Sequence, residues 1–434
     1  NTVQFEVFPV LPELSIQLKV DSFGMLFALV SSFLWIVTSA YSIGYMRGLK
    51  EHGQTRYFCF FALSLSATIG VAFSANLLTL YLFYEMLSFA TYPLVTHHQD
   101  DEAQKSGRKY LAYIVGTSIG FVLPAMILIY HLTGTLTFTP TGILTAETPK
   151  TTLLLLVILL TFGFAKAGMM PFHSWLPAAM VAPTPVSALL HAVAVVKVGA
   201  FCIVRIITGV LGTTALQFHN LGTFIGYCAA FTVIVASLIA LVQDNLKARL
   251  AFSTIGQLSY IILGVALLSP SGLTGSLLHI VMHAFGKITL FFCAGAIFVS
   301  TGIKNISDMK GIGKRMPLTM LAFLFGSLSV IGIPPCGGFI SKWFLLLGTI
   351  QSDQILMLIV FLISSVLNAA YFLPVVYRAF FSPDETSRFD GTVKEAPIWC
   401  LAPLLLTAIC SILLLFFPYP FYSLAQQSVQ AVFQ

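Results

Sequence analysis

The sequence predicts an all-α polytopic membrane protein. The chain has 434 residues, of which 57% are hydrophobic and only 9% are charged, and its mean hydropathy is +0.92. A soluble globule of this length needs more polar surface than this composition supplies. The chain also contains twelve apolar runs, each long enough for a spanning helix of about 20 residues. We therefore expect about 12 transmembrane helices.

The first 20 residues differ from the apolar runs that follow. They alternate short apolar and polar stretches and contain Pro9 and Pro12, which predicts an extended or hairpin-like segment outside the membrane. The apolar runs are residues 22–46, 57–75, 77–96, 109–131, 152–182, 185–209, 221–243, 247–268, 273–300, 317–350, 354–379 and 398–420. The runs 152–182 and 317–350 exceed the about 17 to 25 residues of one straight span and contain prolines, so each is expected to be a broken helix.

Basic residues are distributed unequally between the loops. One face of the twelve-span arrangement receives only Lys19 and Lys150. The alternate loops of the other face hold fifteen: Arg47, Lys50, Arg56, Lys105, Arg108, Lys109, Lys247, Arg249, Lys304, Lys310, Lys314, Arg315, Arg378, Arg388 and Lys394. Because cytoplasmic loops carry excess lysine and arginine, this face is predicted to be cytoplasmic and both termini to lie outside. The same asymmetry explains the net charge of +6 without a nucleic-acid partner.

The sequence gives no sign of a cofactor or a metal. Its seven cysteines lie mostly within apolar runs and never as CxxC, which predicts no disulfide framework, iron–sulfur cluster or zinc site. No signal-peptide pattern precedes the first run. The chain begins at Asn1 instead of methionine, which indicates a trimmed or incomplete N-terminus.

Two lysines stand inside apolar runs. Lys166 and Lys197 flank a stretch with four prolines, Pro171, Pro177, Pro183 and Pro185. A charge at the bilayer centre costs at least about 2.5 to 3.5 kcal/mol, so such lysines normally face a protein interior or a wet cavity. Broken helices at membrane depth survive where protein or water satisfies the freed backbone groups. This stretch therefore predicts a buried polar site.

Glu85 is the acidic residue that lies in the middle of an apolar run; the other fifteen fall in the N-terminal segment, in loops or at the edges of runs. It could be a structural carboxyl kept neutral by burial. The interpretation we favour is a titrating partner of a buried lysine, because opposite charges lower each other's burial cost. Arg205, in contrast, is close enough to the end of its run for its side chain to extend to the interface.

Further titratable groups lie in two later runs. His279, His283 and Lys287 have the spacing i, i+4, i+8, which places them on one helical face. Three aligned groups favour a hydrated proton relay over satisfied core histidines, and the histidine pair lacks a third ligand for metal. Lys342 follows the break of Pro334 to Gly338 and is either a snorkelling lysine beside a hinge or a member of the buried site.

The chain resembles itself weakly at an offset of about 162 to 168 residues. Pro171 to Trp175 parallels the segment from Pro334 to Trp343, each after an apolar run. The units 57–209 and 221–379 hold five runs each, and an odd number predicts that the second unit is inverted relative to the first. The domain organisation predicted is an extramembrane segment 1–20, a helix and loop 21–56, the two repeats, and a loop and C-terminal helix 380–434.

Four motifs, in this order, resemble the antiporter-like subunits of respiratory complex I, membrane-bound hydrogenases and Mrp-type cation/proton antiporters. The motifs are FYEMLSFATYPL with EAQKSGRKYL, FAKAGMMPFHSWLPAAMVAPTPVSALLHA, LLHIVMHAFGKITLFFCAGA, and GIPPCGGFISKW with NAAYFLPVVYRAFF. The resemblance covers nearly all of residues 20 to 420 and looks strongest to the D subunit of Mrp antiporters or a hydrogenase-associated equivalent. That family usually has fourteen spans, which implies that two are missing at the start of this chain.

The resemblance implies a role for each buried charge. Glu85 and Lys166 would form the ion pair of the first proton half-channel, and Lys342 would end the second. Four residues between these half-channels would pass protons along the membrane midplane: Lys197, His279, His283 and Lys287. Lys247 would stand near the cytoplasmic mouth of the path.

The expected function is proton translocation by one subunit of a multisubunit Mrp-type antiporter in the plasma (inner) membrane, with other membrane subunits, the lipid bilayer, protons and Na⁺ or K⁺ as partners. The alternative is a proton-pumping membrane-arm subunit of a complex I-like or hydrogenase-type oxidoreductase, without a catalytic centre of its own. A stand-alone solute symporter is disfavoured, because 38 phenylalanines and single charges in a line indicate a narrow path.

Overall fold

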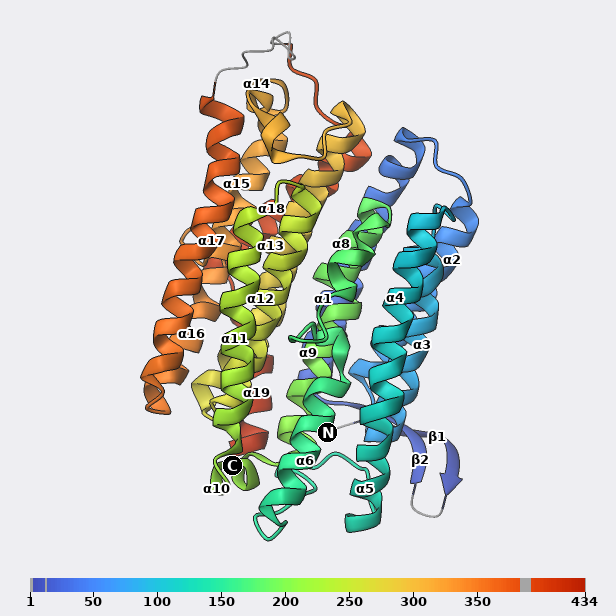
Figure 1. Cartoon of the computed structure of the whole chain (residues 1–434), viewed down its shortest axis with the longest axis vertical. Coiled ribbons are helices and arrows are strands. Elements are labelled where there is room, and N and C mark those ends of the chain that lie inside the picture. Colours follow the sequence, from blue (N-terminus) through green and yellow to red (C-terminus); the bar gives the residue numbers. More distant parts are fainter. Residues whose placement is uncertain (1–2, 12–13, 383–391, 434) are drawn as a thin grey trace.

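The computed structural model describes residues 3–11, 14–382 and 392–433. Helices fill most of this chain (Figure 1): α1 Ser22–Gly48, α2 Gln54–Ala72, α3 Leu77–Val95, α4 Asp101–Thr117, α5 Leu123–Thr133, α6 Lys150–Gly163, α7 Trp175–Ala178, α8 Thr184–Ala192, α9 Val195–Ile206, α10 Thr213–Phe218, α11 Leu221–Val242, α12 Leu246–Ala266, α13 Pro270–Thr301, α14 Ile312–Arg315, α15 Pro317–Ile331, α16 Gly338–Gln351, α17 Ile355–Phe381, α18 Ile398–Phe416 and α19 Tyr419–Phe433. The predicted all-α membrane fold is confirmed. Among the described residues, nine helices are long and apolar enough to cross a membrane.

Each apolar run of the sequence contains a helix or an interrupted pair of helices. The two predicted breaks are confirmed: α6 is followed by a short turn at Ala165–Ala167 and then α7, and α15 is separated from α16. A third interruption, between α8 and α9, was not predicted. There Val193 and Ala194 leave helical geometry, with ψ of −59° and −85°.

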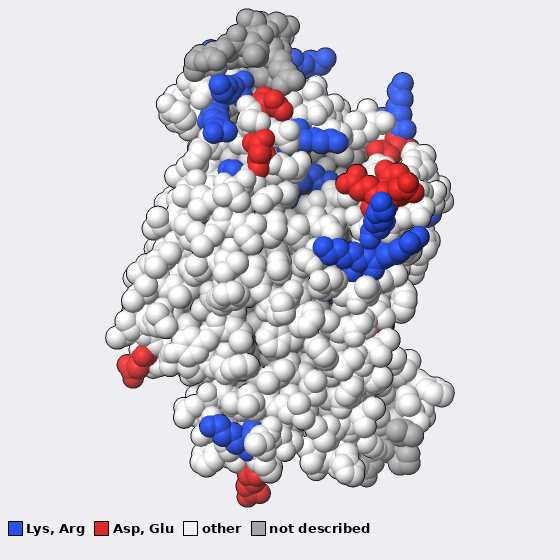
Figure 2. Space-filling view, in the orientation of Figure 1, with Lys and Arg blue, Asp and Glu red and all other residues white. Residues whose placement is uncertain are grey.

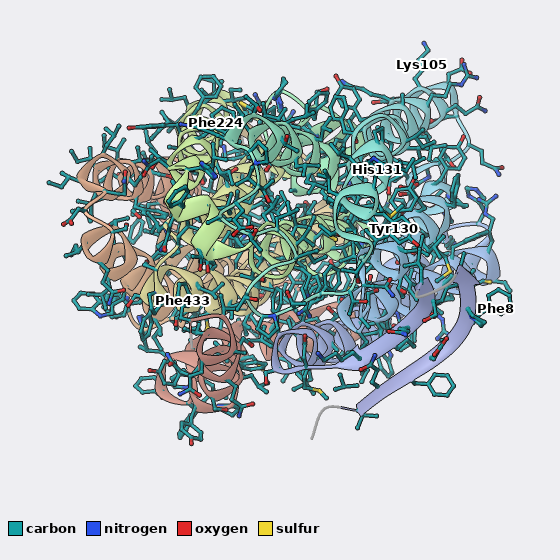
Figure 3. All side chains as sticks on the ribbon, turned by 90° about the horizontal axis from the view of Figure 1, so that it is seen from below. Phe8, Lys105, Tyr130, His131, Phe224 and Phe433 are labelled. Atoms are coloured by element: carbon teal, nitrogen blue, oxygen red, sulfur yellow. The ribbon has the colours of Figure 1, made fainter. Side chains whose placement is uncertain are left out.

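The N-terminal segment forms the expected hairpin. Strand β1, Val3–Leu11, pairs antiparallel with β2, Leu14–Val20, with Phe5 opposite Leu18. Figure 3 places Phe8 at the outer edge of the hairpin, where 60% of the residue is exposed. The inner strand is tied to the bundle by Lys19, whose backbone N–H donates to the Phe73 carbonyl at 2.7 Å.

Polar side chains begin several helices by accepting hydrogen bonds from free backbone N–H groups. The Asp21 carboxylate accepts from Gly24 N at 2.7 Å at the start of α1. Asp100 does the same for α4, and Asn245 for α12. These caps place the start of each apolar segment at a loop.

Helix α13 lies at the centre of the bundle. It packs against α1, α8, α12, α15, α16 and α18. From Gly272 to Ile297 every residue is buried, so its polar side chains can meet only other protein groups or trapped water. This is the helix that carries His279, His283 and Lys287.

Charged residues gather at one end of the molecule. Figure 2 shows lysines and arginines over the end where α14 and the start of α4 lie, and a broad uncharged belt below them. The hairpin and α19 lie toward the opposite end (Figure 1). Arg388, which the sequence also assigns to the basic face, lies outside the described residues.

Arg205 does not extend to solvent alone, because it is held by the capping residue of α1. Its two terminal nitrogens bind the two carboxylate oxygens of Asp21 at 2.6 and 2.9 Å. Burial by itself would raise the pKa of Asp21, but the neighbouring guanidinium and the Gly24 N–H hold this pKa below its usual range. The pair joins the start of α1 to the end of α9.

Candidate functional site

Lys166 lies in the broken segment after α6 and is fully buried. Its ammonium donates to the Tyr84 carbonyl at 2.5 Å and to the Ser88 hydroxyl at 2.7 Å, and it lies 3.2 Å from the centre of the Tyr84 ring. These acceptors come from α3. The break therefore brings the lysine to α3 and gives its charge two oxygens and an aromatic face.

Glu85 sits between these two contact residues on α3. Both of its carboxylate oxygens are buried and have no hydrogen-bond partner among the described residues. In the described part of the chain no direct ion pair joins Glu85 to Lys166; the lysine binds Tyr84 and Ser88 instead. The two side chains are neighbours without a direct contact, and the role of Glu85 stays a prediction.

A glycine makes the approach of α9 to this break possible. A Cβ on Gly199 would lie 2.1 Å from the Ala167 nitrogen and 2.3 Å from the Lys166 carbonyl carbon. A real side chain at this position would displace the turn that carries Lys166. Two residues earlier on α9, Lys197 is also buried, and its ammonium has no hydrogen-bond partner among the described residues.

The stripe on α13 has the geometry that its spacing predicts. The rings of His279 and His283 are stacked, with centroids 5.7 Å apart and planes 17° apart. His279 contacts Gln257 through Nε2 at 3.0 Å and Ser341 through Nδ1 at 2.9 Å. Both ring nitrogens of His283 lack a partner in the described chain. His279 is thus fixed by neighbours from α12 and α16, whereas His283 has unused capacity to bind water or a proton.

Lys287 enters a network that connects α13, α12 and α17. Its ammonium donates to the Ser253 hydroxyl at 2.7 Å. The Tyr371 hydroxyl lies 2.9 Å from the same Ser253 oxygen and also contacts Asn368. Lys287 thereby joins a chain of hydroxyl and amide groups that can exchange hydrogen-bond direction.

Lys342 resembles Lys166 in its surroundings. It lies on α16 just after the second break, and its ammonium donates to the Ile331 carbonyl at 2.8 Å and to the Ser365 hydroxyl at 3.2 Å. Its nitrogen is 4.7 Å from the centre of the Tyr260 ring. The snorkelling alternative does not describe this side chain, because Lys342 is 5% exposed and turned toward protein oxygens.

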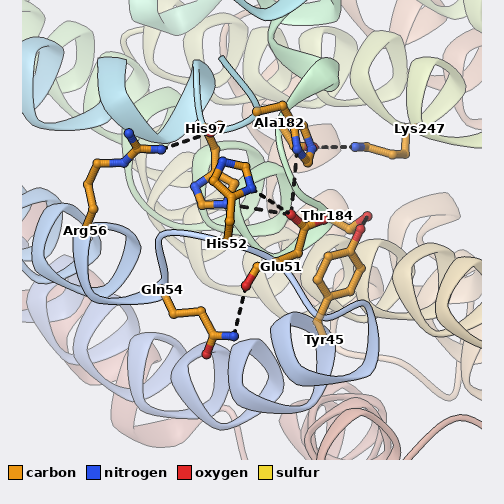
Figure 4. Close-up of polar contacts among 10 residues, drawn as sticks. Tyr45, Glu51, His52, Gln54, Arg56, His97, Ala182, Thr184 and Lys247 are labelled. Carbon is orange, nitrogen blue, oxygen red and sulfur yellow. Dashed lines mark hydrogen bonds and ion pairs between the residues drawn. The ribbon is translucent and has the colours of Figure 1, made fainter. Parts of the chain in front are cut away.

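Lys247 lies apart from the others, near the charged end. Its ammonium donates to the Ala182 carbonyl at 2.7 Å (Figure 4). It lines a cavity of about 670 Å³ whose wall also includes Glu51, His98 and Lys304.

His97 is the residue before the cavity residue His98. Its burial lowers its pKa to about 4, and the nearby side chains of His52, His98 and Arg56 add to this effect, so the imidazole is neutral at pH 7.

The sequence interpretation missed the uncharged members of this arrangement. Gln257 binds His279, Ser253 binds Lys287, and Tyr371 binds Ser253 in turn. A single serine, glutamine or tyrosine in an apolar run is common and carries no positional signal. Ser88 and Ser365 were missed for the same reason. These residues acquire a role only through their contact with a charged or titratable side chain on another helix, and the sequence does not show that contact.

The fold and this site define a multi-pass membrane protein with buried titratable side chains beside broken helices. Residues 74–368 match the family model described as NADH:quinone oxidoreductase/Mrp antiporter, TM. The chain belongs to this family.

Relatives and solved structures agree with the family assignment. The chain is 32% identical over 413 residues to NADH-quinone oxidoreductase subunit N of Desulforudis audaxviator, covering 92% of this chain and 81% of that protein. It is 30% identical to a Na(+)/H(+) antiporter subunit of Alkalihalophilus pseudofirmus, covering 98% of this chain but 56% of that protein. The chain thus spans about half the length of this antiporter relative.

Two solved complexes have subunits of the same fold. A chain of the Mrp complex from Dietzia sp. DQ12-45-1b superposes with a TM-score of 0.87 at 21% identity, covering 100% of this chain and 88% of that one. A chain of the membrane-bound sulfane sulfur reductase, an archaeal respiratory membrane complex, gives 0.87 at 26% identity, covering 98% and 85%. The first likeness establishes the fold alone.

Proposed function

We propose that this chain translocates protons across an energy-transducing membrane as an antiporter-like subunit of a multisubunit Mrp-type cation/proton antiporter. The observation that carries the proposal is the buried series of amines and imidazoles. In chain order these are Lys166, Lys197, His279, His283, Lys287 and Lys342, and each has at most 5% exposure. Ionisable groups inside a membrane protein are costly and mark ion pathways by default.

The two five-run units, 57–209 and 221–379, are proposed to be inverted repeats with one half-channel each. In support, the fourth run of each unit is broken, and each break has a buried lysine beside it. Lys166 and Lys342 both bind one backbone carbonyl and one serine hydroxyl. We assign Lys166, with Glu85 close by, to the first half-channel and Lys342 to the second.

Between the half-channels, the groups with unused hydrogen-bond capacity are proposed to carry the proton. Lys197 and His283 have free polar atoms among the described residues, whereas His279 and Lys287 are bound to side chains that can rotate. A hydrogen bond to a charged group is worth about 1.5 to 3 kcal/mol. A membrane potential supplies about 2.3 kcal/mol per charge at 100 mV, so making or breaking one such bond is enough to gate a step.

Lys247 is assigned to the mouth of the path, because it is half-buried and lines the cavity beside Glu51 and His98. The charged end is proposed to be cytoplasmic and the hairpin end to face outward, in agreement with the distribution of lysine and arginine. The membrane proposed is the plasma (inner) membrane. Na⁺ or K⁺ would be the counter-ion, exchanged with the help of partner subunits.

A second function is favoured by one specific observation. One relative, of which this chain covers 81%, is subunit N of an NADH-quinone oxidoreductase. The alternative is therefore a proton-pumping membrane-arm subunit of a complex I-like or hydrogenase-type oxidoreductase, driven by redox chemistry in other subunits.

The test uses the complete assembly in inverted membrane vesicles, with an entrapped pH dye. In the antiporter, addition of Na⁺ or K⁺ to energised vesicles moves protons; in the pump, an electron donor does so. Lys287→Ala, in assemblies of normal abundance, should abolish proton movement, whereas Lys150→Ala, on an exposed lysine, should not. Unchanged transport in Lys287→Ala would refute the relay. Mass spectrometry of the assembly then separates the two functions by their partner subunits.

A further inference from the structure

Three histidines and one glutamate meet at the charged end, outside the proposed relay. Glu51 and His52 lie in the loop between α1 and α2, and His97 and His98 follow the end of α3. The Glu51 oxygen Oε2 lies 3.9 Å from His52 Nδ1, 3.9 Å from His97 Nε2 and 3.8 Å from His98 Nδ1 (Figure 4). Two separate loops thus direct metal-binding atoms to one point.

The central member of this cluster is buried without a hydrogen bond. The His97 side chain is 0% exposed, and neither of its ring nitrogens has a hydrogen-bond partner among the described residues. A buried polar group without a partner costs about 1 to 3 kcal/mol. A ligand that accepts the imidazole lone pair would remove this cost, and the carboxylate of Glu51 beside it favours a cation.

The spacing is close to that of a metal site. One ligand atom each from Glu51, His52 and His97 lie within 4.8 Å of one another. In a tetrahedral zinc site, with zinc to ligand distances of about 2.0 to 2.2 Å, neighbouring ligand atoms are about 3.4 Å apart. The distances to Glu51 exceed this value by about 0.5 Å, which small side-chain rotations remove.

We propose that Glu51, His52 and His97, with His98 as a fourth ligand or a hydrogen-bond partner, form a binding site for a divalent transition metal, with Zn²⁺ as the ion of best fit. Imidazole and carboxylate are the ligand types that Zn²⁺ takes, whereas Mg²⁺ and Ca²⁺ prefer oxygen alone. The bound ion joins the α1–α2 loop to the α3–α4 loop. Nearby charges act in both directions: Asp100 and Glu102 line the adjoining cavity, while Arg56 donates to the His97 carbonyl at 3.0 Å.

From the sequence we expected no metal site. That expectation rested on the cysteines and on the histidine pair of α13. In this pair His279 binds Gln257 and Ser341, and both ring nitrogens of His283 lack a partner among the described residues. The signal that could have indicated the new site is the presence of Glu51-His52 and His97-His98 at the facing ends of neighbouring helices.

The test is metal binding by the full chain, purified with a tag that contains no histidine. Co²⁺ is titrated as a visible-light probe, and Zn²⁺ is then added as competitor. The expected result is one Co²⁺ per chain with a tetrahedral spectrum, displaced by Zn²⁺. Removal of a residue that only supports a metal ligand weakens metal binding by about 10- to 100-fold. Removal of a direct ligand should weaken it by at least this much.

The variants separate a metal site from general damage. His52→Ala changes a side chain that is 55% exposed, so it should fold normally and lose affinity. Glu51→Gln and His97→Gln should lose it as well. The matched control is His131→Ala, an exposed histidine on α5. Absence of stoichiometric binding in the unmodified chain, or binding that His52→Ala and Glu51→Gln leave unchanged, would overturn the proposal.

Discussion

The ammonium of Lys166 donates a 2.7 Å hydrogen bond to the hydroxyl of Ser88, across the gap between a broken segment and an intact helix. Loss of a hydrogen bond to a charged group costs about 1.5 to 3 kcal/mol, which corresponds to about tenfold or more in an equilibrium. Ser88→Ala should therefore lower proton transport about tenfold while the protein still assembles. Vesicle transport rates, normalised to the amount of protein in the membrane, measure this effect.

The control for that experiment is Ser64→Ala. Ser64 is also buried in a helix, but within the described part of the chain its hydroxyl bonds only the Phe60 carbonyl of its own helix. Equal losses in the two variants would show that the Ser88 effect arises from packing.

Gly199 provides a test of the geometry around Lys166 that does not change any polar group. In Gly199→Ala the new methyl group meets the Ala167 backbone at 2.1 Å, so the Lys166 turn must shift. We expect reduced transport and a lower melting temperature, with a loss of about 1 to 3 kcal/mol, as for other overpacked sites. Gly116→Ala is the matched control, because a Cβ there meets nothing within 4 Å. Transport in Gly199→Ala equal to that of the control would contradict the close approach.

Tyr371→Phe removes one hydroxyl from the Lys287 network and keeps the ring. The 2.9 Å contact with Ser253 is lost, so Ser253 no longer connects Lys287 to α17. Transport should fall several-fold with little effect on assembly. Tyr57→Phe is the comparison, since Tyr57 is buried and bonded to Ser42 but lies outside the relay. If both variants transport at the same rate, the Tyr371 hydroxyl has no part in the path.

The Asp21–Arg205 pair should make stability depend on pH. Because Arg205 and Gly24 hold the pKa of Asp21 below its unfolded value, near 3.9, the pair stabilises the protein above that value. The contribution is lost as pH falls through the lower, folded pKa. At neutral pH, Asp21→Asn should cost about 1 to 3 kcal/mol, between the values for exposed and buried pairs.

Thermal unfolding of the purified chain at several pH values measures the loss. The difference between wild type and Asp21→Asn should shrink as pH falls below 4, and Glu147→Gln, on an exposed loop residue, should show no difference at any pH. A difference independent of pH would mean that Asp21 acts through packing alone.

If both the relay and the metal site are correct, Zn²⁺ should slow transport. The metal ligand Glu51 and its neighbour His98 line the same cavity as Lys247, so a bound ion stands at the proposed entrance. The measurement is the ratio of transport with and without Zn²⁺, compared between wild type and His52→Ala, in which inhibition should be weaker. If Zn²⁺ displaces Co²⁺ from the site but the ratio stays at one, the metal site has no effect on the proton path.

The sequence predicts the helices well because their apolar lengths and loops are local properties. The break between α6 and α7 and that between α15 and α16 contain proline or glycine, which gives them a visible signal. The break at Val193–Ala194 has neither residue, so it depends on tertiary packing and could not be predicted. Helix α19 was also missed, since its polar side chains, such as Gln426 and Gln427, give it too little hydropathy for a span.

For the candidate site, the charged members could be predicted because an ionisable side chain in an apolar run is costly and rare. Their partners could not. The Lys342 ammonium binds the carbonyl of Ile331 and the hydroxyl of Ser365, and neither acceptor is distinguishable in sequence from its neighbours. The expected direct contact between Glu85 and Lys166 is not seen among the described residues, where the ammonium donates to the carbonyl of Tyr84 and the hydroxyl of Ser88 instead.

Ile331 is the last residue of α15, and its carbonyl is available to Lys342 because the helix stops there. In a continued helix the donors to this oxygen would come from Pro334 or Pro335, which have no backbone N–H, so the helical ladder cannot take the carbonyl away from the ammonium. The two prolines thereby reserve the end of α15 as an acceptor for Lys342, which lies on the next helix.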